Sequence, residues 1–139
     1  MKTRFTLECT EELDFAVLAI NSHIKGYKLC WNINNSMQLN FEKKDDHNIK
    51  EELWFARYSY ICDDGVEYNL LANRSKKGYL IPSQKSVNYF LIVKNDYWKN
   101  EKIEFIRRLK SINDILLVFE LDTTLVKYID RFIFNDKKN

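Results

Sequence analysis

Glycine and proline are scarce in this chain of 139 residues, which contains three glycines and one proline. This scarcity excludes collagen-like chains and glycine-rich or proline-rich linkers. Gly26, Gly65 and Gly78 are too far apart to form G-x-G-x-x-G or a P-loop, so no phosphate-binding loop of either kind is encoded. Hydrophobic residues make up 45% of the chain and charged residues 30%, which is typical of a folded globular protein.

Histidine and cysteine, which supply most transition-metal ligands, are also few. His23 and His47 are isolated, and neither C-x-x-C nor H-x-x-x-H occurs. Cys9, Cys30 and Cys62 are odd in number and lie in apolar surroundings, which favours reduced thiols over a disulfide framework. No G-x-S-x-G motif is present. We therefore expect no metal, no cofactor and no catalytic residue, and the sequence favours a protein that is not an enzyme.

Long hydrophobic runs are absent as well. No stretch of 18 apolar residues exists to cross a membrane, and the first residues lack the apolar core of a signal peptide. We expect a cytoplasmic protein that does not associate with membranes. The length predicts a single domain over residues 1–135, followed by a frayed tail at 136–139.

The net charge of +2 is unevenly distributed along the chain. Residues 1–70 carry a net charge of −4 and residues 71–139 a net charge of +6. A basic turn and a basic helix in the second half could contact phosphates, and a neighbouring tyrosine could stack on a base. The candidate nucleic-acid contacts are Arg74, Lys76, Lys77, Tyr79, Arg107 and Arg108. RNA is therefore a possible partner.

Apolar periodicity near the N-terminus predicts two helices. Residues 4–9 suggest a short strand, after which Thr10 can cap a helix. The first apolar stripe consists of Leu13, Ala16, Val17, Ile20 and Ile24. The second consists of Tyr27, Cys30, Ile33 and Met37. Together these patterns predict an αα-hairpin joined near Gly26.

The rest of the chain predicts a sheet. Residues 42–52 are polar enough to be a solvated connection, whereas residues 54–61 and 66–73 form strands around a turn at 63–65. Residues 87–93 and 115–121 are apolar on both faces, which is typical of central strands, and a helix over 100–112 connects them. The expected fold is α+β, with the N-terminal αα-hairpin packed on a mostly antiparallel sheet that contains one βαβ crossover.

Residues 81–89 read IPSQKSVNY, and this segment resembles the signature of the bacterial IPExxxVDY family. Four of the six fixed positions match, namely Ile81, Pro82, Val87 and Tyr89. The order of further segments is also similar, at residues 27–31, 57–58, 73–75 and 119–122. The resemblance implies a small, single-domain, cytoplasmic bacterial protein, and it brings no established activity with it.

Two positions depart from the family pattern. Ser83 stands where the family has Glu, and Asn88 stands where it has Asp. Neither residue can transfer protons or bind metal as a carboxylate pair does, but both can accept hydrogen bonds from backbone N–H groups. We therefore interpret the segment as a structural turn that leads into a central strand.

Three functions remain open from the sequence. The first is a non-enzymatic adaptor that acts by protein–protein contact, with Tyr97 and Trp98 as an exposed contact and Trp31, Tyr58 and Tyr89 in the core. The second is an RNA- or ribosome-associated factor. The third is a small-molecule binder or enzyme at the strand end near Glu120 and Asp122, where Glu120 could instead form an ion pair with Arg57, Arg107 or a lysine. The sequence identifies neither the protein partner nor the oligomeric state.

Overall fold

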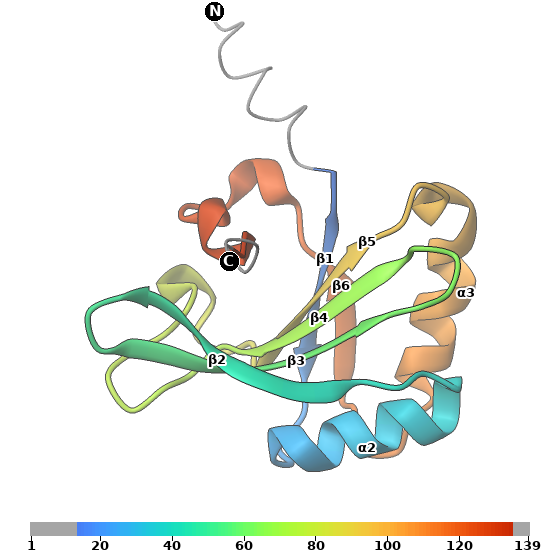
Figure 1. Cartoon of the computed structure of the whole chain (residues 1–139), viewed down its shortest axis with the longest axis horizontal. Helices are drawn as coiled ribbons and strands as arrows, with labels where there is room; N and C mark the ends of the chain where they lie inside the picture. The colour runs from blue at the N-terminus through green and yellow to red at the C-terminus, as the bar shows by residue number, and fades with distance from the viewer. Residues whose placement is uncertain (1–13, 135–139) are drawn as a thin grey trace, which may run out of the picture.

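The computed structural model of the protein describes residues 14–134, in which two helices pack on an antiparallel sheet of six strands (Figure 1). The strands are β1 (Ala16–Asn21), β2 (Glu42–Lys50), β3 (Leu53–Ile61), β4 (Glu67–Ala72), β5 (Tyr89–Lys94) and β6 (Leu117–Glu120). The helices are α2 (Gly26–Met37) and α3 (Trp98–Lys110), with short 3₁₀ turns at Pro82–Gln84, Thr123–Leu125 and Ile129–Phe132. The spatial order is β2-β3-β4-β5-β1-β6.

Both faces of the sheet are covered. Leu18 and Ile20 of β1 point to the face on which α2 and α3 pack, where they join Leu29, Ile33 and Leu109. The other face is covered by the loop between β4 and β5 and by the segment after β6. The core on this face includes Val17, Ala19, Leu80, Phe90 and Phe132. Strands in the middle of the sheet are therefore apolar on both sides, as buried strands must be.

The first predicted helix is wrong, and with it the αα-hairpin. Residues 16–21 form β1, which lies between β5 and β6 and pairs antiparallel with both. Val17, Leu18, Ala19 and Ile20 are all fully buried, because the strand has covered faces on both sides. A short apolar run of this kind is compatible with helical spacing, so periodicity cannot separate the two structures. The strand predicted at 4–9 and the cap at Thr10 lie outside the described residues.

The second predicted helix is confirmed as α2. Leu29, Cys30, Ile33 and Met37 form its buried side. Trp31, expected in the core, is instead 65% exposed, and Tyr27 lies exposed one turn before it. Lys25 and Gly26 lead into this helix, and a Cβ at Gly26 would lie 3.0 Å from the Tyr58 hydroxyl. The absence of a side chain at Gly26 therefore lets α2 start close against β3.

The predicted βαβ crossover also needs correction. α3 does connect β5 with β6, and these two strands run in the same direction, but β1 lies between them. No two neighbouring strands among the described residues are parallel. β6 is consequently an edge strand, although its apolar sequence predicted a central one. β5 is central, as predicted, and its first five residues are buried.

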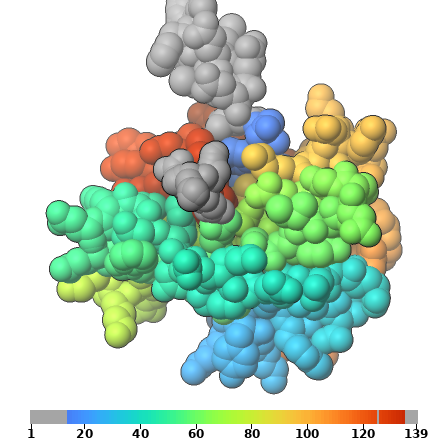
Figure 2. Space-filling model, viewed as in Figure 1, coloured from blue at the N-terminus to red at the C-terminus, as the bar shows by residue number. Residues whose placement is uncertain are grey.

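The polar segment 42–52 is another correction, because most of it forms β2, the opposite edge of the sheet. β2 pairs with β3 through two register shifts, between Lys44 and His47 and between Asn48 and Lys50. Figure 2 shows β2, in teal, across the front of the molecule above α2, in blue. The β3–β4 hairpin is confirmed; Gly65 in its turn has φ of +89°, which suits glycine.

Candidate functional site

The segment that resembles the IPExxxVDY signature forms a turn, and the side chain of Asn73, which precedes the segment in sequence, holds this turn by hydrogen bonds. The Asn73 Nδ2 donates to the carbonyls of Gln84 and Val87, each at 2.9 Å, and its Oδ1 accepts from the Ile81 N–H at 2.9 Å. Asn73 is fully buried, so these bonds replace water for three backbone groups. From the sequence, Asn73 was placed only at the end of a strand and in the segment 73–75 that is similar to the family, without this hydrogen-bonding role.

This segment has buried residues near its two ends and exposed residues in its turn. Ile81 and Val87 are buried, and Pro82 opens the 3₁₀ turn through a trans peptide bond, since the described residues contain no cis bond. Ser83 is exposed, and its side chain makes no hydrogen bond with residues 14–134, contrary to the expectation that it would satisfy a backbone donor. The turn is consistent with a structural role.

Asn88 and Tyr89 fasten β5 to the loop that follows β1. The Asn88 Oδ1 accepts from the Ser22 N–H at 2.9 Å, and the Tyr89 hydroxyl donates to the Ile24 carbonyl at 2.6 Å. Burial raises the pKa of Tyr89 to about 12, so its hydroxyl remains protonated at neutral pH. These two bonds fix the loop at residues 22–24 relative to the segment 81–89.

A pocket of about 340 Å³ lies between this loop and the segment. Arg74 and Tyr79, two of the predicted nucleic-acid contacts, contribute to its wall together with Lys85, His23 and Asn88. Arg74 and Tyr79 are bridged through their backbones, and the Lys85 ammonium lies 5.6 Å from the centre of the Tyr79 ring. The structure thus brings part of the predicted cationic surface together.

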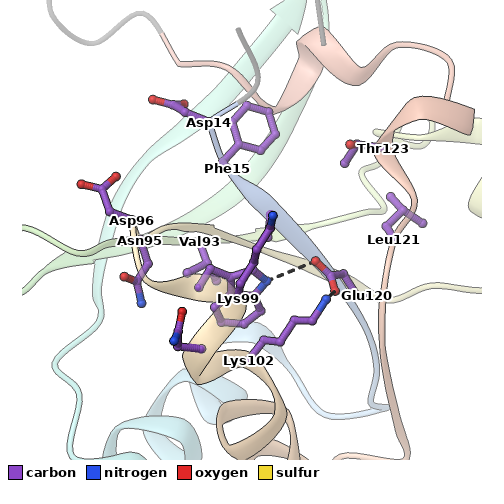
Figure 3. Close-up of a pocket in the computed structure, with 13 residues that line it drawn as sticks. Asp14, Phe15, Val93, Asn95, Asp96, Lys99, Lys102, Glu120, Leu121 and Thr123 are labelled. Atoms are coloured by element: carbon purple, nitrogen blue, oxygen red, sulfur yellow. Dashed lines mark hydrogen bonds and ion pairs between the residues drawn. The ribbon is translucent and has the colours of Figure 1, made fainter. Parts of the chain in front are cut away.

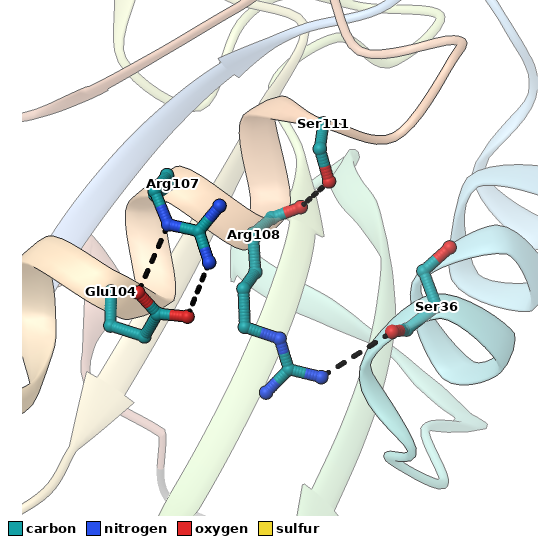
Figure 4. Close-up of polar contacts among 5 residues, drawn as sticks. All are labelled: Ser36, Glu104, Arg107, Arg108 and Ser111. Carbon is teal, nitrogen blue, oxygen red and sulfur yellow. Dashed lines mark hydrogen bonds and ion pairs between the residues drawn. The ribbon is translucent and has the colours of Figure 1, made fainter.

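The remaining predicted nucleic-acid contacts lie elsewhere. Lys76 does not line the pocket, and Lys77 forms an ion pair with Glu52 at 3.1 Å, beside the β2–β3 hairpin. Arg107 donates two hydrogen bonds to Glu104, at 3.0 and 2.6 Å, and Arg108 contacts the Ser36 carbonyl of α2 at 3.5 Å (Figure 4). Figure 1 places α3 at the right of the view and the hairpin at the left. The basic turn and the basic helix therefore do not form one surface.

The strand end near Glu120 carries a larger pocket, of about 540 Å³, whose wall combines acids with lysines (Figure 3). Both carboxylate oxygens of Glu120 are engaged: Oε2 accepts from the Trp98 indole at 3.1 Å and Oε1 from Lys102 at 2.9 Å. The Glu120 carboxylate therefore links β6 to α3, and the partner is Lys102, one of the lysines that sequence analysis left open. Asp122 is likewise engaged, because it caps the turn that follows through Thr124.

Of the two residues predicted as a protein contact, Tyr97 and Trp98, only Tyr97 is exposed. Tyr97 is 67% exposed, but Trp98 is 9% exposed, so the expectation that Trp98 lies at the surface is wrong. Its ring packs edge-on against Phe105 at 5.5 Å while its N–H reaches Glu120. The polar neighbours of Trp98 suggested an exposed position. In the structure α3 begins at Trp98, and the indole points toward the core.

The edge strand β6 exposes apolar side chains that sequence analysis placed inside. Leu117 is 46% exposed and Phe119 38% exposed, both on the face opposite the helices, while Leu116 just before the strand is 61% exposed. The backbone on the outer side of β6 has no neighbouring strand among residues 14–134. Exposed apolar residues on an unpaired edge are typical of a strand that pairs with another chain.

Metal ligation and thiol chemistry find no support at these places. No group of three or more potential metal ligands exists within the described residues. Cys30 lies on the buried side of α2, and burial raises the pKa of its thiol to about 11, which keeps it protonated. None of the helices in the described part of the chain is long and apolar enough to span a membrane.

Comparison with other proteins assigns no relationship, because no protein-family model and no curated protein matches this chain.

Proposed function

We propose that this protein is a non-enzymatic adaptor that acts by protein–protein contact, and that β6 is the edge through which it assembles. The observation that carries the proposal is the exposed apolar surface of Leu116, Leu117 and Phe119 along a strand whose outer backbone groups are unpaired. Such an edge gains both backbone hydrogen bonds and apolar burial when another strand is added.

The occupant we propose is a second copy of this chain, related by a two-fold axis. In an antiparallel pairing with Val118 opposite Val118 of the partner subunit, Leu117 lies opposite Phe119 of the partner subunit, and the converse pair repeats it. Glu120 then lies opposite Leu116 of the partner subunit, so no acidic side chain faces another acid in these pairs. An isologous contact therefore satisfies the edge without adding like-charge repulsion.

The contacts of Glu120 support an adaptor over an enzyme at the neighbouring strand end. A general acid or base needs a carboxylate oxygen free to reach the substrate. In this structure Trp98 and Lys102 engage both oxygens, and the carboxylate connects β6 to α3. The same contacts support the edge, since they fix its last residue to the helix.

The proposal includes a cytoplasmic location and membership of the IPExxxVDY family. The location is supported by the protonated, buried Cys30 and by the chain's lack of a long apolar run. The family membership is supported by the four matching positions, of which Ile81, Val87 and Tyr89 are buried.

Sedimentation velocity on the full chain, from low to high micromolar concentration, tests the proposal. We expect a concentration-dependent dimer in the native protein. Phe119→Lys places a charge next to the two-fold axis of the contact and should weaken the dimer by about a hundred-fold or more. Trp31→Lys is the matched control, because it makes the same exchange of an exposed aromatic residue for lysine on α2. A monomer at all concentrations, or equal weakening by both variants, would contradict the proposal.

A further inference from the structure

The pocket beside the β4–β5 loop presents hydrogen-bond donors without acidic partners. No Asp or Glu lines it, and its wall includes Arg74 and Lys85. Neither side chain forms a hydrogen bond or ion pair within residues 14–134; Lys85 overlies the Tyr79 ring. Other cations of the chain, such as Lys77 and Arg107, are neutralised by a glutamate. The positive charge of the pocket is therefore left uncompensated by the fold.

A polar side chain in the wall adds a neutral donor of fixed orientation. The Asn88 Oδ1 is held by the Ser22 N–H, which assigns the amide and leaves the Nδ2 group as a donor. That group has no partner among the described side chains and backbone groups, although Asn88 is only partly exposed. Asn88 therefore has one end bonded to the scaffold and the other free for a ligand.

The frame around these donors is rigid. Tyr89 bonds the Ile24 carbonyl, and Asn73 holds the segment 81–87 from beneath. Hydrogen bonds from Asn88 and Tyr89 thus tie the segment 81–89 to the loop at residues 22–24. A backbone frame fixed in this way, together with the oriented Asn88 amide, reduces the conformational entropy that is lost when a ligand binds.

The chemistry of the wall selects the ligand. Two cations and an amide donor match a phosphate monoester, which carries close to two negative charges and three acceptor oxygens at pH 7. The volume of about 340 Å³ lies in the range of small-molecule sites and exceeds the need of a bare phosphate. The half-buried Tyr79 ring offers an apolar wall to the organic part.

We infer that the pocket formed by Arg74, Tyr79, Lys85 and Asn88 binds a phosphate monoester, with its phosphate between Arg74 and Lys85 and its organic group against Tyr79. A nucleoside 5′-monophosphate and the 5′-phosphate end of an RNA strand share this chemistry. The site is separate from the β6 edge and does not depend on dimer formation.

Isothermal titration of the full-length protein with AMP, using adenosine as the matched ligand without phosphate, tests the inference. We expect AMP to bind and adenosine not to bind. Arg74→Gln and Lys85→Gln should each weaken AMP binding by about ten-fold or more, since each removes a charge-assisted contact. Lys76→Gln removes one charge from the same turn outside the pocket and should change affinity by less than about two-fold.

Three results would overturn the inference: no binding of AMP at millimolar concentration, equal binding of adenosine, or equal weakening by Arg74→Gln and Lys76→Gln. Arg74 and Lys85 are exposed, so both variants should retain the native melting temperature, which is measured alongside. A short RNA with and without its 5′-phosphate separates the two sources. Tighter binding of the phosphorylated RNA than of AMP identifies the strand end as the ligand, and weaker binding identifies the free nucleotide.

Discussion

The two edge strands of the sheet, β2 and β6, differ in how their unpaired backbone groups are protected from pairing with another chain. β2 is nine residues long and charged from Glu42 through Asp46, and its pairing with β3 shifts register twice. β6 has four residues in regular register with β1 and exposes Leu117 and Phe119. Charge and bulges discourage the addition of a further strand, whereas a regular apolar edge invites it. The comparison indicates which end of the sheet is available to a partner.

Removing the protection of β2 should have the largest effect. Lys44→Thr, Asp45→Val and Asp46→Thr together replace charges with residues that favour strands. A chain with two unprotected edges can pair head to tail, and such a contact does not close, so we expect open-ended polymers in place of dimers. Static light scattering measures the change. The control keeps Lys44 and carries Asp45→Lys and Asp46→Lys, and polymers of that variant would show that charge on β2 does not protect the edge.

High pH should lower the stability of the whole sheet, because the buried tyrosines that ionise lie on its central strands. Burial is the main cause that raises the pKa of Tyr68 on β4 to about 12, above its usual value near 10, as it does for Tyr89. Both folded-state pKa values are raised, so the stabilising contribution is complete below pH 10 and is lost as the pH rises from 10 towards 12. Each tyrosine contributes at most about 2–3 kcal/mol.

Chemical denaturation between pH 8 and 12 measures this loss. Tyr68→Phe should flatten the alkaline decline, because no ionisable group remains at that position. Tyr97→Phe, at an exposed site, should leave the decline as it is. A native pH profile that stays level to pH 12 is incompatible with burial of the two hydroxyls.

The smallest expected effect is the difference between the two edges in how much an ion pair contributes to the free energy of unfolding. Glu120 bonds both Lys102 and the buried Trp98, whereas Asp46 on β2 contacts the exposed Lys43 at 2.9 Å. We expect Glu120→Gln to lower the free energy of unfolding by about 1 kcal/mol and Asp46→Asn to leave it nearly unchanged. Urea denaturation of both variants decides the matter, and equal effects would mean that β6 gains nothing from α3.

The same contrast explains what the sequence could predict. The β3–β4 hairpin, the central strand β5 and helix α2 have clear signals, namely alternation around Gly65, an apolar run, and the stripe that includes Ile33 and Met37. β2 gave no signal, because an edge strand exposed to water needs no apolar alternation, so its residues resembled a loop. β6 gave a misleading signal, because its apolar residues were interpreted as those of a buried central strand, whereas β6 is an exposed edge strand.

The candidate sites were predictable in part. Arg74 and Tyr79 were found from the basic turn, but the roles of His23, Lys85 and Asn88 depend on loops far apart in sequence that meet beside β4 and β5. Trp98 was misplaced because its partner, Glu120, is 22 residues away. Long-range hydrogen bonds of this kind leave no local pattern in the sequence.

Hydrogen–deuterium exchange at two protein concentrations tests the central claim, that β6 and not β2 is the open edge. In a dimer built on β6, amides of residues 116–120 become more protected as the concentration rises, while those of residues 42–50 exchange at an unchanged rate. Protection in β6 that is independent of concentration, or a rise confined to β2, would contradict the account.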